Sequence, residues 1–385
     1  MKKLSAALAA AALSLSLSYS AAQAQSLPAP TLAAKSWLLL DATSGQTIAA
    51  DNADLRIEPA SLVKLMTIYV AFEAIKEKKL TLDQMITVSE RAWKVDPSSS
   101  KMFIEPRVPV KLSDLLYGII VQSGNDASVA VAEAVAGTEE AFVALMNRQV
   151  ERMGLKSTHF ANAHGLPSPN NYSTAQDLAV LATRLVADHP DAYKIYSTKS
   201  FTYNKITQPN RNRLLWLDSS VDGMKTGHTQ ASGYSLVASA KRPNGSGERR
   251  LISVVLGTAS DHARAQESQK LLTWGFQNFD TVKLYAKGAP VATPEIWKGT
   301  QNQIKLGFNH DVYVTVPRGM ADKMKPVLER RDPLVAPVAE NSKVGVLKMV
   351  ADGKTLAEFP LLALEQVNQA SIFGRAWDSI RLWMK

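Results

Sequence analysis

The pattern of apolar and polar positions predicts an α+β domain in the larger, N-terminal part of the chain. Two short segments, 36–41 and 46–50, are predicted to be strands joined by a turn at Ser44-Gly45. Helical spacing then predicts helices over 61–79, 112–121, 127–136, 139–153 and 175–187. Two strands over 234–240 and 251–257, joined by the polar loop 241–247, precede a helix over 265–276. Because strands lie at both ends of this order, we expect one sheet completed by distant parts of the chain.

The pattern changes beyond about residue 280 to short alternating runs. Examples are 311–316 and 345–350, the second followed by the turn Asp352-Gly353-Lys354. Such runs without intervening helices are typical of a small all-β domain. We therefore expect four parts: a leader over 1–24, a large domain over 25–280, a small β-sandwich over 281–367 and a terminal helix over 368–385.

The terminal segment is amphipathic at helical spacing. One face carries Ile372, Phe373, Ala376, Trp377, Ile380, Trp383 and Met384, and the other carries Arg375, Asp378, Ser379, Arg381 and Lys385. Such a helix reaches only about 20 Å, less than the roughly 30 Å of a bilayer core. We expect it to lie in a membrane surface with its aromatic side chains among the headgroups. The alternative is a terminal helix packed on its own protein.

The first 24 residues have the pattern of a secretory signal peptide. Lys2-Lys3 precede an apolar run, and Ala22-Gln23-Ala24 supplies a small-x-small cleavage site. An uncleaved membrane anchor is the alternative, but serines interrupt the run. The chain has no cysteine, so its stability must come from packing rather than disulfides. We expect a protein of the bacterial envelope.

The charge balance points to an anionic surface as partner. Lys and Arg number 44 against 35 Asp and Glu, which gives a net charge of +9 at pH 7. No basic block with interleaved aromatic residues occurs in the sequence, and an exported protein rarely meets nucleic acid. We therefore expect a membrane surface or a cell-wall polymer as partner, and no nucleic acid.

Candidate chemistry begins with the spacing Ser-x-x-Lys, which occurs at Ser61/Lys64 and at Ser98/Lys101, no more often than chance supplies. Context separates the pairs, because Ser98 lies in a polar stretch whereas Ser61 opens an apolar helix just after Pro59. Residues i and i+3 share a helix face, so Ser61 Oγ and Lys64 Nζ can meet. Burial lowers the pKa of a lysine, which could then deprotonate a nucleophilic Ser61. The alternative is a helix cap at Ser61 and a lysine that reaches solvent.

Two further motifs favour the chemical interpretation. Ser123-Gly124-Asn125 lies at a break between two predicted helices, where a hydroxyl and an amide can project into a cleft. Lys225-Thr226-Gly227 precedes the strand over 234–240, and we expect it in an edge strand of the sheet. Each motif alone is more often a turn. Together and in this order, Ser-x-x-Lys, Ser-x-Asn and Lys-Thr-Gly are the signature of serine acyl-transferases.

With these motifs the sequence resembles the penicillin-binding proteins, and specifically the low-molecular-mass D-alanyl-D-alanine carboxypeptidases. The resemblance extends to the stretches 123–127, 222–229, 271–276 and 316–319 and covers nearly all of the chain after the leader. It implies a penicillin-binding, β-lactamase-like fold in which helices cover both faces of an antiparallel sheet. It also implies removal of the terminal D-alanine from peptidoglycan pentapeptides, covalent inhibition by β-lactam antibiotics, and a periplasmic location at the inner membrane.

The resemblance implies roles for the residues of the first two motifs. Ser61 would attack the carbonyl between the two terminal D-alanines, and Lys64 would act as its base. Ser123 would pass a proton to the leaving D-alanine, while Asn125 would orient Lys64 and hold the substrate peptide. Ser99-Ser100 would fall in a loop that flanks the site, where serines are as often simple turn formers.

The resemblance also implies a substrate-binding set. Lys225 and Thr226 would bind the terminal carboxylate, supported by Arg264, which the pattern puts just before the last helix of the domain. An ordinary surface arginine is the alternative for Arg264. Gly227 would let the substrate backbone approach the strand, and the backbone N–H groups of Ser61 and His228 would form an oxyanion hole.

Other activities fit the sequence less well. A class A β-lactamase shares the three motifs but also needs Glu-x-x-Leu-Asn, which this chain lacks. A D,D-endopeptidase of peptidoglycan cross-links uses the same motifs, but usually without the β domain and the tail. A catalytically inactive envelope binding protein need not keep all the motif residues. The sequence contains no Gly-x-Ser-x-Gly elbow, His-Glu-x-x-His motif or P-loop, so we expect neither a metal nor a cofactor.

Overall fold

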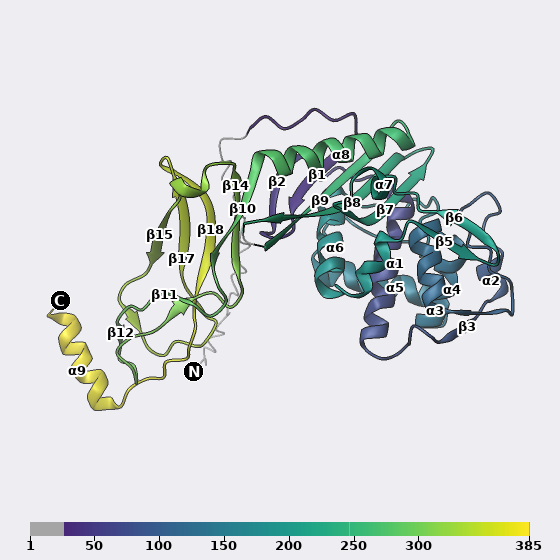
Figure 1. Ribbon diagram of the computed structural model, residues 1–385. Helices are drawn as coiled ribbons and strands as arrows, with labels where there is room; N and C mark the ends of the chain where they lie inside the picture. The colour runs from purple at the N-terminus through teal and green to yellow at the C-terminus, as the bar shows by residue number, and fades with distance from the viewer. Residues whose placement is uncertain (1–26, 246, 385) are drawn as a thin grey trace, which may run out of the picture.

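The computed structural model describes residues 27–245 and 247–384, so the leader expected over 1–24 lies outside the described residues. An α+β domain and a smaller β domain lie end to end, and helix α9 stands at the far end of the β domain (Figure 1). This arrangement agrees with the fold class expected from the sequence.

The larger domain is built on a five-stranded sheet in the order β2-β1-β9-β8-β7, with antiparallel neighbours throughout. Its strands are β1 (Ser36–Asp41), β2 (Gln46–Asp51), β7 (Val221–Thr229), β8 (Gly233–Asn244) and β9 (Gly247–Thr258). As expected, distant parts of the chain complete the sheet: β1 pairs with β9, while β2 and β7 lie at its two edges. Within the polar stretch 241–247, expected to be a loop, residues 241–244 continue β8 and Gly247 begins β9. There the side chains of Lys241 and Glu248 on adjacent strands form an ion pair at 3.1 Å.

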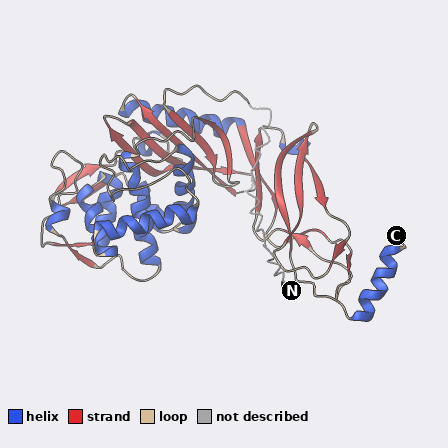
Figure 2. Ribbon diagram, turned by 180° about the vertical axis from the view of Figure 1, so that it is seen from behind, coloured by secondary structure: helices blue, strands red, loops and turns tan. Residues whose placement is uncertain are grey.

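Helices cover both faces of this sheet. Helix α8 (Asp261–Asn278) packs on one face, where alternate residues such as Trp37 and Leu39 of β1 meet Leu272. The opposite face packs on the helical part of the domain, as the view from behind shows (Figure 2). That part contains α1 (Lys64–Lys76), α2 (Glu90–Trp93), α3 (Leu112–Tyr117), α4 (Asn125–Ala136), α5 (Glu139–Met153) and α6 (Ala175–Asp188). Successive side chains of a strand point to opposite faces of the sheet, so each strand contributes residues to two separate hydrophobic cores.

Shorter elements complete this domain. They are the 3₁₀ turns η1 (Ala60–Val63) and η3 (Ala192–Ser197), the π-helical turn η2 (Gly118–Gln122), the short helix α7 (Leu214–Leu217) and the strand pairs β3 (Met85–Thr87) with β4 (Pro109–Lys111) and β5 (Ser200–Tyr203) with β6 (Ile206–Pro209).

Several predicted helices differ from the structure at their ends, and two of these differences concern candidate site residues. The helix expected to begin at Ser61 starts as the 3₁₀ turn η1, and α1 itself begins at Lys64. The last helix of the domain was expected from 265 but begins at Asp261, because Ser260 Oγ caps it by accepting a bond from Ala263 N–H at 3.0 Å. Arg264 therefore lies inside the first turn of α8 and not before it.

The smaller domain consists of short strands around its own core. A five-stranded sheet has the order β11 (Pro290–Ala292), β13 (Leu306–Gly307), β18 (Lys354–Ala363), β17 (Lys343–Ala351) and β15 (Lys325–Arg330). The remaining strands pair as β10 (Phe279–Tyr285) with β14 (Val312–Pro317) and β12 (Ile296–Trp297) with β16 (Leu334–Val335), and η4 (Ala321–Lys323) is a 3₁₀ turn. The expected strands over 311–316 and 345–350 correspond to β14 and β17.

Helix α9 (Ile372–Trp383) rests on the β domain with its polar face. The Asp378 carboxylate accepts a hydrogen bond from Lys298 N–H at 2.7 Å, and the Arg381 guanidinium lies 5.2 Å from the centre of the Trp297 ring. The apolar face points away, with Phe373 88% and Trp383 89% exposed. Within residues 27–245 and 247–384, every helix is too short or too polar to cross a membrane.

Candidate active site

Ser61 and Lys64 meet where η1 joins α1. The Lys64 ammonium donates a hydrogen bond to Ser61 Oγ at 3.1 Å, which is the i, i+3 contact that the motif predicts. The lysine side chain is fully buried, so the alternative in which it reaches solvent is excluded. Ser61 Oγ does not cap the helix and lines a cleft instead.

Lys64 Nζ has two further acceptors, each from a different segment. It donates to Asn125 Oδ1 at 2.7 Å and to the carbonyl oxygen of His164. Burial, aided by the positive charge of Arg211, lowers the pKa of Lys64 from 10.5 to about 7, although Asp126 opposes the shift. The amine can therefore be neutral and accept a proton near neutral pH.

The Ser-x-Asn motif lies at a sharp helix break. The turn η2 ends at Gln122, the following residue Ser123 has a left-handed φ of 62°, and α4 begins at Asn125. This turn aims both side chains at the same cleft. Ser123 Oγ is buried and has no hydrogen-bond partner among the described residues, so it is available to a bound molecule.

The Lys-Thr-Gly motif lies on the edge strand β7, as expected. Lys225 is buried and donates to the carbonyl of Thr226 at 3.0 Å. Burial, together with the charges of Lys64 and Arg211, holds the pKa of Lys225 well below its usual value. Residues 226–229 of β7 line the cleft, whereas Lys225 does not.

Gly227 has a packing role that the sequence did not reveal. A side chain at this position would meet the carbonyl oxygen of Pro59 at 2.9 Å and Leu62 Cγ at 3.1 Å. The absent Cβ therefore lets β7 pack closely on η1, which carries Ser61. We expected the glycine to make room for substrate, but its free side faces the protein.

Arg264 is the buried end of an aromatic and charged cluster at the cleft. Its Nη1 donates to the carbonyl of Gly227 at 3.3 Å, Nη2 pairs with Asp261, and the guanidinium lies 5.6 Å from the centre of the Tyr234 ring. His228 stacks on the same tyrosine with ring centres 3.8 Å apart. The alternative of a plain surface arginine is thereby excluded, since only 6% of Arg264 is exposed.

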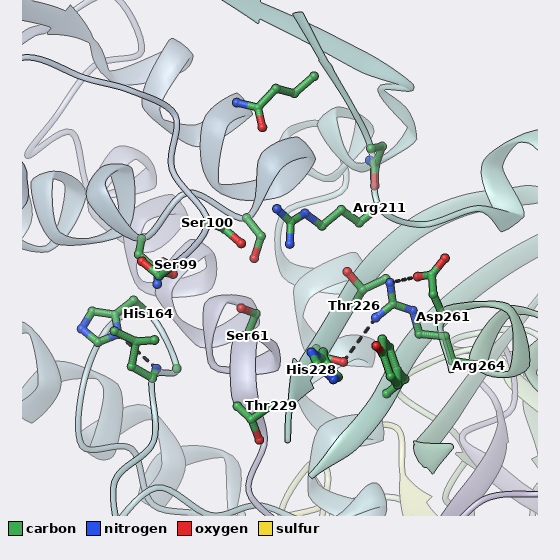
Figure 3. A pocket seen from close by; sticks show the side chains of 18 of the residues that line it. Ser61, Ser99, Ser100, His164, Arg211, Thr226, His228, Thr229, Asp261 and Arg264 are labelled. Carbon is green, nitrogen blue, oxygen red and sulfur yellow. Dashed lines mark hydrogen bonds and ion pairs between the residues drawn. The ribbon is translucent and has the colours of Figure 1, made fainter. Parts of the chain in front are cut away.

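A cleft of about 690 Å³ brings together the predicted residues Ser61, Ser123, Asn125, Thr226, Gly227, His228 and Arg264. Lys64 and Lys225 are buried and are not among its lining residues. Ser61, Ser100, Arg211 and Thr226 border one open space, and Arg211 extends into it from the segment after β6 (Figure 3). Arg211 was missed by sequence reasoning because a lone arginine between two asparagines carries no motif. Together with Arg264 it makes one end of the cleft cationic, which suits a carboxylate.

The loop that carries His164 was also missed. Residues 164–166 line the cleft opposite β7, and the contact with Lys64 is made by the main-chain carbonyl of His164. Burial lowers the pKa of the His164 imidazole to about 4. A backbone contact of this kind leaves no residue-type signal in the sequence.

Comparison with known proteins identifies the family. A model of the D-alanyl-D-alanine carboxypeptidases matches residues 22–260, and a model of the C-terminal domain of penicillin-binding protein 5 matches residues 279–369. The chain belongs to the D-alanyl-D-alanine carboxypeptidase family. This carboxypeptidase is 44% identical over 363 residues to D-alanyl-D-alanine carboxypeptidase DacC of Escherichia coli K12, covering 93% of this chain and 90% of the relative.

Solved structures agree with this assignment. The structure of penicillin-binding protein 5 from Haemophilus influenzae matches the carboxypeptidase with a TM-score of 0.86 and 43% identity, over 89% of this chain and 100% of that one. Penicillin-binding protein D2 from Listeria monocytogenes, in its cefotaxime-bound form, matches with a TM-score of 0.59 and 29% identity over 65% of this chain and 100% of that one. The carboxypeptidase is thus a serine hydrolase of the penicillin-binding protein 5 type, as the motifs predicted.

Proposed function

We propose that this carboxypeptidase removes the terminal D-alanine from peptidoglycan pentapeptides through an acyl-enzyme on Ser61. The observation that carries the proposal is the Lys64 amine, which is buried, has a pKa of about 7 and lies 3.1 Å from Ser61 Oγ. A lysine with an ordinary pKa near 10.4 would be protonated at neutral pH and could not act as a base.

Acylation then follows from the positions of the side chains. Lys64 Nζ takes the hydroxyl proton while Ser61 Oγ bonds to the carbonyl carbon between the two D-alanines. The C–N bond breaks, and Ser123, whose hydroxyl is unpaired, passes a proton to the leaving amine. Backbone N–H groups of Ser61 and His228 stabilise the oxyanion, where one donor is typically worth ~3–4 kcal/mol.

The second half-reaction returns Ser61 to its free form. Water attacks the ester carbonyl, Lys64 accepts one of its protons, and the serine oxygen leaves with a proton. Lys64 is the residue proposed for this step as well, because its amine lies nearest to the ester oxygen.

The cationic end of the cleft binds the free carboxylate of the last D-alanine. Thr226 supplies a hydroxyl donor there, and Arg211 and Arg264 supply two guanidinium groups. Lys225, which is buried next to Thr226 on β7, is proposed as a further donor to the carboxylate. An endopeptidase substrate has a long peptide in place of the small leaving D-alanine. Mass spectrometry of muropeptides tests the choice: the carboxypeptidase shortens pentapeptides by one D-alanine and leaves cross-linked dimers intact, whereas an endopeptidase splits the dimers and an inactive binding protein changes neither.

Penicillins are proposed to react with the same serine. A β-lactam offers a strained amide and a carboxylate, which suit Ser61 and the cationic end of the cleft. The Listeria relative binds cefotaxime, and this supports the proposal. The acylated form should persist, because the sequence contains no Glu-x-x-Leu-Asn motif.

The proposed organisation puts the carboxypeptidase at the periplasmic face of the inner membrane. Residues 1–24 are proposed as a signal peptide, 25–280 as the catalytic domain, 281–367 as the small β domain and 368–385 as a surface anchor. The exposed Phe373 and Trp383 and the net charge of +9 support attachment to an anionic membrane.

A further inference from the structure

The loop over residues 162–166 is fastened to the segment that carries the nucleophile. The His164 carbonyl accepts a hydrogen bond from Lys64, and one residue earlier the Ala163 carbonyl accepts one from Thr67 Oγ1 at 2.6 Å. Gly165 lies so close to the Ala60 carbonyl that a Cβ there would approach it to 2.0 Å. The position of this loop therefore sets where the Lys64 amine points.

Glu139 holds the same loop through the backbone of Ala163 and the ring of His164. It is the first residue of α5 and only 5% exposed. Its Oε1 accepts a hydrogen bond from Ala163 N–H at 3.0 Å and lies 3.4 Å from His164 Nε2. Its Oε2 pairs with Arg91 Nη2 at 2.7 Å. One carboxylate thus ties the loop to α5 and, through Arg91, to α2.

The tautomer of His164 fits this arrangement. Leu166 N–H donates to His164 Nδ1 at 3.1 Å, so Nδ1 is the acceptor nitrogen and the proton lies on Nε2, which faces Glu139. A buried carboxylate is costly unless it is paired and hydrogen-bonded, and Glu139 is both. Glu139 is therefore an integral part of the loop support.

We propose that Glu139 is a positioning residue for Lys64: it fixes residues 163–164 so that the His164 carbonyl keeps the amine aimed at Ser61. The proposal rests on the proposed role of Lys64 as the base. Glu139 acts through the loop and does not itself touch the cleft in this arrangement.

Loss of Glu139 should slow acylation without removing any catalytic group. Displacements of about 1 Å can cost about 100-fold in rate, so we expect covalent labelling to slow by about 10- to 100-fold. The His164 carbonyl favours the charged amine, so its withdrawal should lower the pKa of Lys64 further. The charged groups that otherwise act on Lys64 are Arg211, Asp126 and Lys225, and all three remain in the variant.

The experiment measures the second-order rate of labelling by a fluorescent penicillin between pH 5 and 9. Glu139→Ala is compared with the parent and with Glu140→Ala. Glu140 is the matched control, since it also pairs with Arg91, at 3.0 Å, but is exposed and has no contact with residues 162–166 among its described interactions. Glu139→Ala should label about 10- to 100-fold more slowly, with the midpoint of its acid limb at lower pH, whereas Glu140→Ala should match the parent in both.

Other outcomes overturn the proposal. These are an unchanged rate, a slower rate with the midpoint in place or at higher pH, and an equal effect of Glu140→Ala. If Glu139→Ala does not fold, Glu139→Gln decides by the same two readouts with smaller changes in the same directions, because its single amide oxygen cannot replace both carboxylate oxygens, one of which accepts from Ala163 N–H while the other pairs with Arg91. Ser61→Ala, run alongside, tests the proposed function separately: labelling of that variant contradicts the acyl-enzyme, whatever Glu139 does.

Discussion

The Asp126 carboxylate accepts a hydrogen bond from the backbone N–H of Met102 at 2.8 Å, and so joins the start of α4 to the loop that carries Ser99 and Ser100. It also accepts from Phe103 N–H at 2.8 Å. Asp126 directly follows Asn125, so one short segment holds both Lys64 and this wall of the cleft.

Removal of this carboxylate should loosen the loop. We predict that Asp126→Ala lowers the free energy of unfolding by about 3 kcal/mol, because several buried N–H groups lose their acceptor. Denaturant unfolding measures the loss, and hydrogen exchange should show reduced protection at residues 102–104. Asp83→Ala is the control, since this exposed carboxylate pairs with Lys111 at the surface and should matter by less than about 0.5 kcal/mol. Equal losses in the two variants would contradict the role of Asp126.

The close approach of the 162–166 loop to η1 predicts a strong effect at Gly165. Its φ is +86°, and an added Cβ would meet the Ala60 carbonyl. Gly165→Ala should cost about 2–4 kcal/mol of stability and slow penicillin labelling. Gly154 also has a positive φ, +70°, but a Cβ there would meet no other atom. Gly154→Ala should therefore lower the free energy of unfolding by only about 1 kcal/mol and leave labelling unchanged. Unfolding midpoints and labelling rates of the two variants decide the matter.

Acylation should depend on the protonation of Lys64. The neutral amine is the base, so the labelling rate should rise with pH through a midpoint of about 7. The positive charge of Arg211 lowers the pKa of Lys64, and its removal should raise that pKa. Arg211→Gln should therefore move the acid limb to higher pH and slow labelling at pH 7. A midpoint that stays in place would show that Arg211 does not act on the lysine.

The exposed face of α9 should bind membranes. Replacing both Phe373 and Trp383 by serine removes two large apolar side chains, and binding to anionic vesicles should weaken by at least about tenfold. Co-sedimentation with the vesicles measures it. Ser379→Ala on the polar face is the matched control and should bind like the parent. Unaltered binding of the double variant would contradict the anchor, and cleavage of a soluble peptide should be the same in all three proteins.

Most of the fold could be predicted because the core helices have apolar residues at helical spacing and the core strands are short apolar segments bounded by polar or turn residues. The short apolar runs in β1 and β9 and the helical spacing in α5 and α6 predicted the correct elements, and the order of elements predicted a sheet completed by distant strands. The predictions were wrong at the ends of elements, where a single capping residue can determine at which residue a helix begins. The Ser260 cap makes α8 begin earlier than predicted. Strands β8 and β9 continue into a polar stretch, where Lys241 and Glu248 form an ion pair.

Only some residues of the candidate site could be predicted from the sequence. The three motifs predicted five of these residues, because the chemistry requires those side chains at those spacings. They are Ser61, Lys64, Ser123, Asn125 and Lys225. Arg211 and Glu139 carry no motif, and His164 contributes a carbonyl that any residue possesses. Contacts between segments about 100 residues apart depend on the folded chain, so the supports of the site appear only in the structure.

The most direct test of the account is covalent labelling of the purified chain with a fluorescent penicillin. The parent and Ser98→Ala, which alters the other Ser-x-x-Lys pair, should both be labelled, whereas Ser61→Ala should carry no label. Retention of the label by Ser61→Ala, or its loss from Ser98→Ala alone, would contradict the assignment of Ser61 as the nucleophile.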